Sequence, residues 1–289
     1  MRNSKLTPVI LLLPLMAVTL TVIIACVNVL LQSIGYVPAF GLTKITLGYY
    51  REVFKRPEFL SALWVSLRIA FVSTLLAAAL GTLLCAALVK RRAGGGMLYT
   101  VRFPILVPHT VVALFIMTLL GQTGIVARAA YGLGLISDYT KFPQILFTPG
   151  YGGAIAGYLW KEIPFVAYYT LALMASVSNT LGEAAENLGA SPLRSFFSVT
   201  LPMSLSAVSK AALIIFIYAF GGYELPALLG STLPKALPVQ AYITYLSPDL
   251  LQRPLAMAMF GVILMLSVLM AALYSIGIRR LIKRLGGEA

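Results

Sequence analysis

Residues 8–31 read PVILLLPLMAVTLTVIIACVNVLL, an apolar run that contains no charged residue. A helix of about 20 residues crosses the hydrocarbon core of a bilayer, whereas the apolar part of a secretory signal peptide has only about 7–15 residues. A faint likeness to a lipoprotein cleavage box at residues 23–26 does not change this, because the run continues past Cys26 to Leu31. The sequence therefore predicts a spanning helix that stays in the membrane.

The composition of the whole chain agrees with a membrane protein. Of its 289 residues 60% are hydrophobic and 11% are charged, with a mean hydropathy of +0.91. Soluble domains carry about 25% charged residues. The net charge of +13 does not indicate a nucleic-acid partner, because the basic residues separate apolar runs instead of gathering on one polar face.

Cysteine and histidine exclude two classes of protein. The two cysteines, Cys26 and Cys85, both lie in apolar runs, and His109 is the single histidine. A disulfide framework needs several paired cysteines, and a zinc site needs a cluster of His and Cys ligands. We therefore expect no metal site and no disulfide-stapled fold.

Five further apolar runs follow the first, which predicts an all-α membrane protein with six spans in a single permease domain covering residues 1–289. Between the spans, Gly, Pro and Tyr favour turns and interfacial positions. No internal repeat is evident, so a secondary transporter built from inverted repeats gains no support. The expected spans are 8–32, 62–89, 99–120, 153–178, 206–229 and 255–278.

Basic residues give the expected orientation. Clusters at Arg2 and Lys5, at 90–92 and at 279–284 all fall on one side of a six-span topology. Positive charge marks the cytoplasmic side of membrane proteins, which places both termini there. The opposite side also carries basic residues in 33–61, although acidic residues accompany them.

A distinctive pattern lies between the fourth and fifth expected spans, in residues 180–202. The chain reads Glu183-Ala184-Ala185, has Gly189 six residues after the glutamate, and ends in Leu201-Pro202. This pattern resembles the EAA loop, the signature of the membrane subunits of bacterial ABC importers. The one departure is Val199, where isoleucine is common.

The residues themselves favour a helix, a turn and a second helix on the cytoplasmic surface. Glu183 and Glu186 suit the positive end of a helix dipole, and alanine has the highest helix propensity. Gly189 permits a left-handed break, and Ser191-Pro192 has the order of a cap followed by the first helical residue. A plain polar loop between helices is the alternative, but it does not require the Gly and Leu-Pro offsets.

The resemblance implies the fold and partners of a type I ABC importer permease of the bacterial inner membrane. Its coupling helix would seat on an ATPase subunit through Glu183, Ala184, Ala185 and Gly189, with Leu201 and Pro202 closing the segment. To this contact set we add Arg194, since a basic side chain there could pair with an acidic residue of the ATPase.

The chain has no Gly-Lys dipeptide and hence no G-x-x-x-x-G-K-[ST] phosphate loop. We therefore expect no enzymatic activity in this chain, with ATP and Mg²⁺ bound by a partner. The resemblance implies two ABC ATPase subunits, a second permease that is identical or different, and an extracytoplasmic solute-binding protein. It points to the branch that carries polyamines, ferric iron, thiamine, sulfate and phosphonates, without choosing among these solutes.

Four ionisable residues fall within the expected spans at a similar depth, toward the outer side. Charge at membrane depth is costly and faces a cavity or a partner. The four residues either border the solute path or form structural pairs, such as Arg68 with Glu162 or Glu224. Breaks at Pro164, Gly221-Gly222 and Pro226 fit either interpretation. The candidate residues are Arg68, Lys161, Glu162 and Glu224.

Two other classes of function remain as alternatives. An ATP-independent channel or secondary carrier would need a proton or ion relay, for which the intramembrane charges are the one support. An intramembrane enzyme would need a nucleophile and a base, and no such pair is evident. His109, beside Pro108, is expected to be packed or interfacial. Neither alternative would need a docking element at residues 180–202.

Overall fold

The computed structural model describes residues 6–284, with side chains described from Ile10 to Gly277. The described chain is helical and contains no strand, only an isolated bridge between Val37 and Leu42. Arg2 and Lys5, which contribute to the predicted orientation, lie outside the described residues. The expected all-α class is confirmed.

The chain divides into two compact units. The first unit contains residues 1–60 and 240–266, and the second contains residues 61–239 and 267–289. Each unit is described by itself.

The first unit contains α1 (Leu6–Ser33), which follows the first expected span closely, and the short α2 (Gly48–Lys55). Ser33 at the end of α1 forms a hydrogen bond of 2.8 Å with the hydroxyl of Tyr50. Gly261 allows that hydroxyl to approach, because a Cβ there would lie 2.3 Å from it. Most of α1 is exposed and apolar, as expected of a helix that faces lipid.

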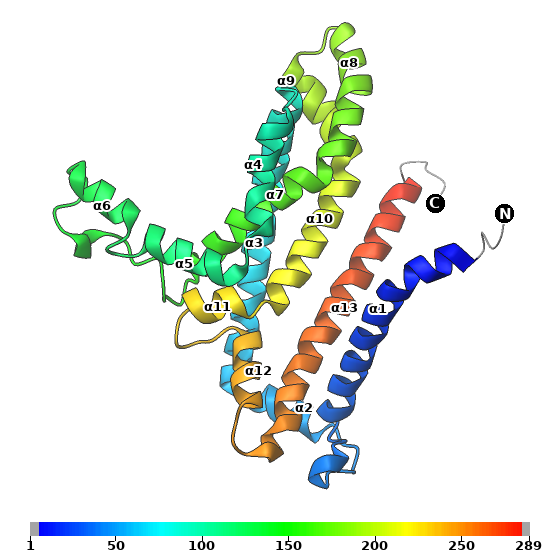
Figure 1. Cartoon of the computed structure of the whole chain (residues 1–289), viewed down its shortest axis with the longest axis vertical. Helices are drawn as coiled ribbons and strands as arrows, with labels where there is room; N and C mark the ends of the chain where they lie inside the picture. The colour runs from blue at the N-terminus through cyan, green and yellow to red at the C-terminus, as the bar shows by residue number, and fades with distance from the viewer. Residues whose placement is uncertain (1–5, 285–289) are drawn as a thin grey trace. The chain divides into compact units, whose positions relative to one another are not determined.

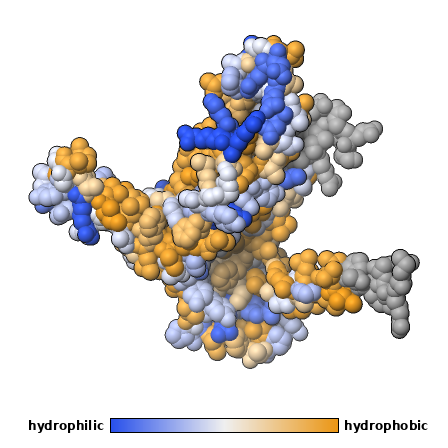
Figure 2. Space-filling view, turned by 45° about the horizontal axis from the view of Figure 1, so that its top comes forward, coloured by the Kyte–Doolittle hydropathy of each residue, from blue (hydrophilic) through white to orange (hydrophobic). Residues whose placement is uncertain are grey.

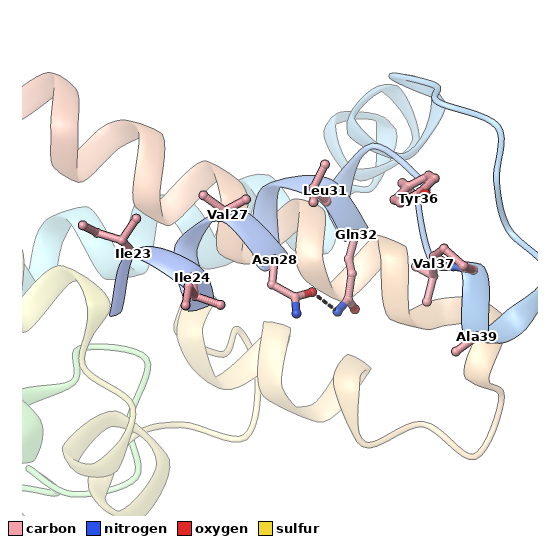
Figure 3. Close-up of a pocket in the computed structure, with 10 residues that line it drawn as sticks. Ile23, Ile24, Val27, Asn28, Leu31, Gln32, Tyr36, Val37 and Ala39 are labelled. Atoms are coloured by element: carbon pink, nitrogen blue, oxygen red, sulfur yellow. Dashed lines mark hydrogen bonds between the residues drawn. The ribbon is translucent and has the colours of Figure 1, made fainter. Parts of the chain in front are cut away.

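One surface of α1 and the turn after it forms a shallow hollow of about 450 Å³ (Figure 3). Its lining is mainly apolar, from Ile23 to Ala39. The polar members Gln32 and Asn28 satisfy each other, since the Gln32 amide donates to Asn28 Oδ1 over 2.6 Å. This pairing removes most of the cost of two amides on an apolar helix.

The second unit is a bundle in which α7 packs against α10, α4 and α5 (Figure 1). Two π-helical turns, Ser178–Gly182 and Phe196–Thr200, flank its tip. Three helices, α3, α12 and α13, have residues in both units. The helices are α3 (Pro57–Lys90), α4 (Gly95–Leu106), α5 (His109–Leu120), α6 (Ile125–Gly132), α7 (Gly152–Val177), α8 (Glu183–Asn187), α9 (Pro192–Ser195), α10 (Leu201–Gly221), α11 (Glu224–Leu229), α12 (Leu237–Tyr245) and α13 (Arg253–Arg284).

Small residues bring α3 and α7 together. A Cβ on Gly81 would lie 2.6 Å from Cβ of Val166 and 2.7 Å from the carbonyl oxygen of Ile163. Around this contact Ala77, Val166 and Ile215 are fully buried in one cluster. Close helix packing through small residues is typical of membrane bundles, where dispersion contacts stabilise association.

Five helical stretches within the described residues are long and apolar enough to cross a membrane. They include Pro192–Gly221, in which α9, the second π-helical turn and α10 are continuous. Helix α7 is long enough for a crossing but is less apolar than these five stretches, since it carries Lys161 and Glu162. On the face shown in Figure 2, hydrophobic residues cover much of the helical surface and hydrophilic ones gather at the end with α8 and α9.

Two expected spans are not continuous helices, and this corrects the sequence prediction. The range 99–120 is divided between α4 and α5, because Pro108 has no N–H and forces the preceding residue into extended backbone. The range 206–229 is divided between α10 and α11 at Gly222, where the backbone is also extended. By contrast, α7 continues through Pro164.

The glycine contact predicts a specific sensitivity. Gly81→Ala should destabilise the fold by about 1–3 kcal/mol, the usual cost of overpacking a core, because neither Ile163 O nor Val166 Cβ can move alone. Thermal unfolding of the purified protein in detergent measures this. The matched control is Gly96→Ala, since a Cβ there meets nothing within 4 Å. Equal melting temperatures for the two variants would contradict the packing.

Candidate functional site

The 180–202 segment is the tip of a helical hairpin. The helix that begins as α7 continues through the turn Ser178–Gly182 into α8 without leaving right-handed helical backbone. The second helical arm of the hairpin starts at α9 and continues into α10. Figure 1 shows both helical arms ending together at α8 and α9.

The expectation that Glu183 begins a helix is therefore wrong. Gly182, in the position before it, has φ −65° and ψ −50°, so the helix is already under way. Nothing in residues 178–182 lacks an N–H or demands extended backbone, and the π-helical turn keeps the hydrogen bonding continuous. The glutamates lie near the end of a long helix, and their favourable interaction with a helix N-terminus is lost.

The turn itself follows the predicted chemistry. Gly189 has φ +95°, a conformation that glycine adopts at no steric cost, and its N–H donates to the carbonyl of Glu186 over 2.9 Å. Ser191 is the cap of α9: its hydroxyl accepts a hydrogen bond of 3.3 Å from the N–H of Arg194. Pro192 occupies the first helical position, as predicted.

A polar contact holds the two helical arms of the hairpin together. The Ser195 hydroxyl donates to the carbonyl oxygen of Gly182 over 3.0 Å, and Ser195 and Thr200 are both buried. A Cβ on Gly182 would lie 3.3 Å from the Thr200 hydroxyl and 3.4 Å from that of Ser195. Because this contact joins the two helical arms beside their π-helical turns, the tip is constrained to move with both arms.

The predicted contact residues are spread around this tip. Glu183 is exposed and lies 3.7 Å from Arg92 of the basic turn after α3. Arg194 and Ala184 are exposed, Ala185 is half-buried, and Pro202 is exposed at the start of α10, beside half-buried Leu201. A hollow of about 410 Å³ lies between the hairpin and the end of α3, lined in part by Glu183 and Glu186.

Exposed apolar side chains at the tip were not singled out from the sequence. Leu188 is 90% exposed, Leu193 is 73% exposed and Phe197 is 58% exposed. The signal was present as two leucines flanking Gly189 and Ser191, but their exposure depends on the turn geometry. Such residues are typical of a surface that another protein covers.

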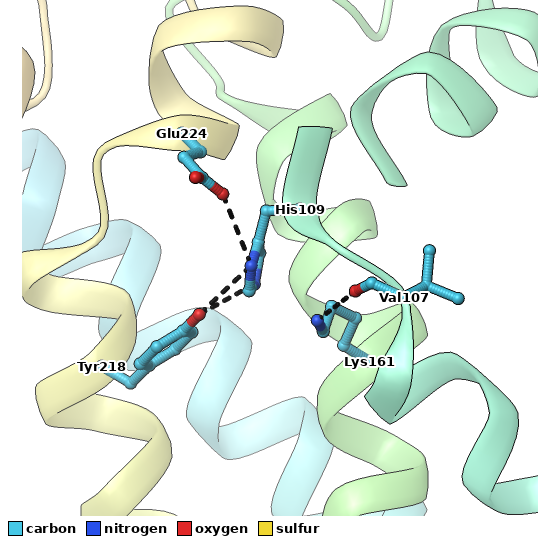
Figure 4. Close-up of polar contacts among 5 residues, drawn as sticks. All are labelled: Val107, His109, Lys161, Tyr218 and Glu224. Carbon is cyan, nitrogen blue, oxygen red and sulfur yellow. Dashed lines mark hydrogen bonds and ion pairs between the residues drawn. The ribbon is translucent and has the colours of Figure 1, made fainter. Parts of the chain in front are cut away.

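A second polar site lies at the helix breaks (Figure 4). The Lys161 ammonium on α7 donates to the carbonyl of Val107 over 2.6 Å, at the point where α4 ends. Lys161 is 8% exposed and Glu162 is 7% exposed. The bond satisfies a carbonyl at a helix break, where a polar group without a partner is costly.

The same break positions His109 at the start of α5. Its Nδ1 lies 3.6 Å from the carboxylate of Glu224, at the start of α11. The hydroxyl of Tyr218 lies 3.2 Å from Nδ1 and 3.1 Å from Nε2 of that imidazole. Residues from α5, α10 and α11 therefore meet, as the dashed lines in Figure 4 show.

Arg68 does not pair with Glu162 or Glu224. Its guanidinium donates to the carbonyl of Pro149, and two residues earlier the Ser66 hydroxyl accepts from the N–H of Leu237 over 2.7 Å. Arg68 thus fastens a connection between helices. The predicted ion pairs with Arg68 are wrong, because this carbonyl holds the guanidinium, while Lys161, Glu162 and Glu224 do lie near one another.

His109 and Tyr218 are functional-site candidates that sequence reasoning missed. His109 was expected to be a packed residue, and Tyr218 has no local signature. Their contact with Glu224 joins positions that are far apart in the chain, which one sequence does not reveal.

Comparison with known proteins decides the family. A family model described as "Binding-protein-dependent transport system inner membrane component" matches residues 73–285. The chain belongs to this family. It is a permease component and the transmembrane subunit of an ATP-driven importer, with several membrane crossings.

Curated relatives of this permease serve different transport systems. The molybdenum transport system permease protein ModB of Haemophilus influenzae is 24% identical over 233 residues, which cover 78% of this chain and 96% of ModB. The sn-glycerol-3-phosphate permease UgpA of Pectobacterium atrosepticum is 29% identical, over 75% of this chain and 74% of UgpA. The putrescine permease PotI of Escherichia coli is 26% identical, over 58% and 55%.

Solved structures show the same fold. A chain of a bacterial alginate ABC transporter, in complex with an alginate pentasaccharide-bound periplasmic protein, matches with a TM-score of 0.74 at 18% identity. The match covers 96% of this permease and 98% of that chain. A chain from an amino acid ABC transporter matches with a TM-score of 0.52.

The hairpin contact gives a testable prediction. Ser195→Ala removes the donor to the Gly182 carbonyl and should cost about 1 kcal/mol of stability, with faster proteolysis within residues 180–202. Limited proteolysis followed by mass spectrometry measures the cleavage rate. Ser198→Ala is the control, since Ser198 is exposed on the π-helical turn that directly follows Ser195. Equal cleavage of both variants would show that the contact does not hold the tip.

Proposed function

We propose that this permease forms half of a translocation pathway and is driven by separate ATPase subunits that bind the tip of the α7–α10 hairpin. The observation that carries the proposal is the exposed turn around Gly189. It combines Leu188, 90% exposed, with the carboxylates of Glu183 and Glu186 and the guanidinium of Arg194. Apolar anchors within a charged rim suit a protein partner.

The hairpin geometry supports a way to transmit movement. Helices are stiff along their axes, and both helical arms run from the tip into the apolar bundle. The arm that contains α10 is continuous as far as the break at Gly222. A partner that shifts the tip would shift α7 and α10 together, because Ser195 joins their ends. The break at Gly222 gives the far end of α10 freedom to respond.

We further propose six crossings with both termini in the cytoplasm, in a single domain with residues 180–202 as the coupling segment. Helix α7 would be the sixth crossing beside the five apolar stretches, since its two charged residues are buried. Helix α5 lies within one of these stretches, His109–Gly132, and α4 would lead into the same crossing. An even number of crossings agrees with basic residues at 90–92 and 279–284 on the same side.

The partners follow from this role. Two ABC ATPase subunits would bind ATP and Mg²⁺, a second permease would complete the pathway, and an extracytoplasmic solute-binding protein would deliver the solute. Relatives named for sulfate and putrescine transport agree with the predicted branch, whereas those named for molybdenum and sn-glycerol-3-phosphate transport lie outside the solutes it names. A channel or carrier without ATP would leave the exposed tip without a role.

Co-purification tests the coupling. In the native host, Glu183→Arg combined with Gly189→Glu should abolish recovery of a P-loop ATPase with the permease, because the changes reverse a charge and strain the αL turn. Mass spectrometry of the detergent-purified complex identifies the ATPase. Glu58→Arg, at the start of α3, serves as the control. A folded wild-type permease that carries no ATPase would contradict the proposal.

A further inference from the structure

A cavity opens where two helices break in the second unit. It has a volume of about 460 Å³, within the range of small-molecule sites. The α5 side contributes His109, and the break between α10 and α11 contributes backbone around Gly222. The lining residues that matter for binding are His109, Tyr158, Tyr218, Gly222, Tyr223 and Glu224.

Glu224 gives this lining its charge. The other lining residues are neutral side chains or glycine, apart from the imidazole of His109. The Glu224 side chain is 54% exposed, and its partner is that imidazole at 3.6 Å, not an arginine or lysine. A carboxylate attracts a cation when no basic side chain is paired with it directly.

Aromatic faces complete the site. Three tyrosines, Tyr158, Tyr218 and Tyr223, line the cavity, and the rings of His109 and Tyr218 lie 5.4 Å apart between centroids. A Cβ on Gly222 would lie 2.0 Å from the Tyr158 hydroxyl, so glycine is required for that tyrosine to sit against the break. Aromatic rings beside a carboxylate are the arrangement that binds ammonium groups through cation–π contact.

The nearby lysine is turned away from the cavity. Lys161 is not among the lining residues, because its ammonium is held by the carbonyl of Val107. Glu162 is buried next to it and opposes its field at Glu224. Glu224 is the ionisable carboxyl that lines the cavity, and its negative charge disfavours an anion here.

We propose that this cavity binds the ammonium group of a cationic solute during transport, with Glu224 as the counter-ion and the tyrosine rings as the walls. The inference rests on the proposed importer function and names the class of its solute: an organic amine that carries at least one primary or quaternary ammonium. It excludes oxyanions such as molybdate from this site.

Binding of radiolabelled putrescine to the purified complex, without the solute-binding protein, tests the site. Glu224→Gln should weaken binding by about tenfold or more, since a charge-assisted contact is lost. Tyr218→Leu should weaken it several-fold, while Tyr218→Phe, which keeps the ring, should stay within about twofold. Glu58→Gln, a carboxylate that does not line the cavity, is the control and should bind as wild type.

The outcomes separate this inference from the importer function. If the ATPase co-purifies but putrescine does not bind, or binds equally to Glu224→Gln, the importer function stands and the cation site is overturned. If the ATPase is absent, both the proposed importer function and the cation site are overturned. Should Glu224→Gln fail to fold, Glu224→Asp and the Tyr218 pair carry the test, because aspartate keeps the charge and should retain binding. Competition by molybdate at the same site would also overturn the proposal.

Discussion

The bond between Lys161 and the carbonyl of Val107 is the interaction on which the functional half of the molecule depends. A helix that breaks inside a membrane exposes backbone groups where water cannot satisfy them. Here a lysine from α7 supplies the donor over 2.6 Å. With the end of α4 fixed on α7, α5 starts at His109 in a defined direction. That direction brings the imidazole to Glu224 and Tyr218 and shapes the cavity beside them.

The same bundle connects this cavity to the exposed tip. Helix α7 carries Lys161 and continues to Glu183, and α10 runs from the tip to the break at Gly222 that forms one wall of the cavity. A site that changes with the hairpin could therefore bind solute in one state and release it in another. The exposed tip and the cavity are both connected to α7 and α10, which is the physical basis for coupling them.

Much of the fold could be predicted because a bilayer leaves few choices. An apolar run such as 8–31 has to form a helix in lipid, and α1, α3 and α13 follow the expected spans closely. Gly189 and Ser191-Pro192 also behave as their local chemistry predicts, since these effects involve neighbouring residues only. The break at Pro108 could have been predicted from proline's missing N–H, but the apolar run around it concealed the signal. The continuous helix through residue 182 and the meeting of His109 with Glu224 depend on tertiary packing, which no local pattern encodes.

Photo-cross-linking from the hairpin tip tests the central claim most directly. In a chain with Cys26→Ala and Cys85→Ala, a benzophenone attached through Ala185→Cys should form an adduct with a P-loop ATPase in the native complex. The same label on Thr46→Cys, in the connection after α1, should form none. An ATPase adduct from position 185 alone is the result that the account predicts. A complex that retains its ATPase but gives no adduct from position 185, or equal adducts from both positions, would contradict it.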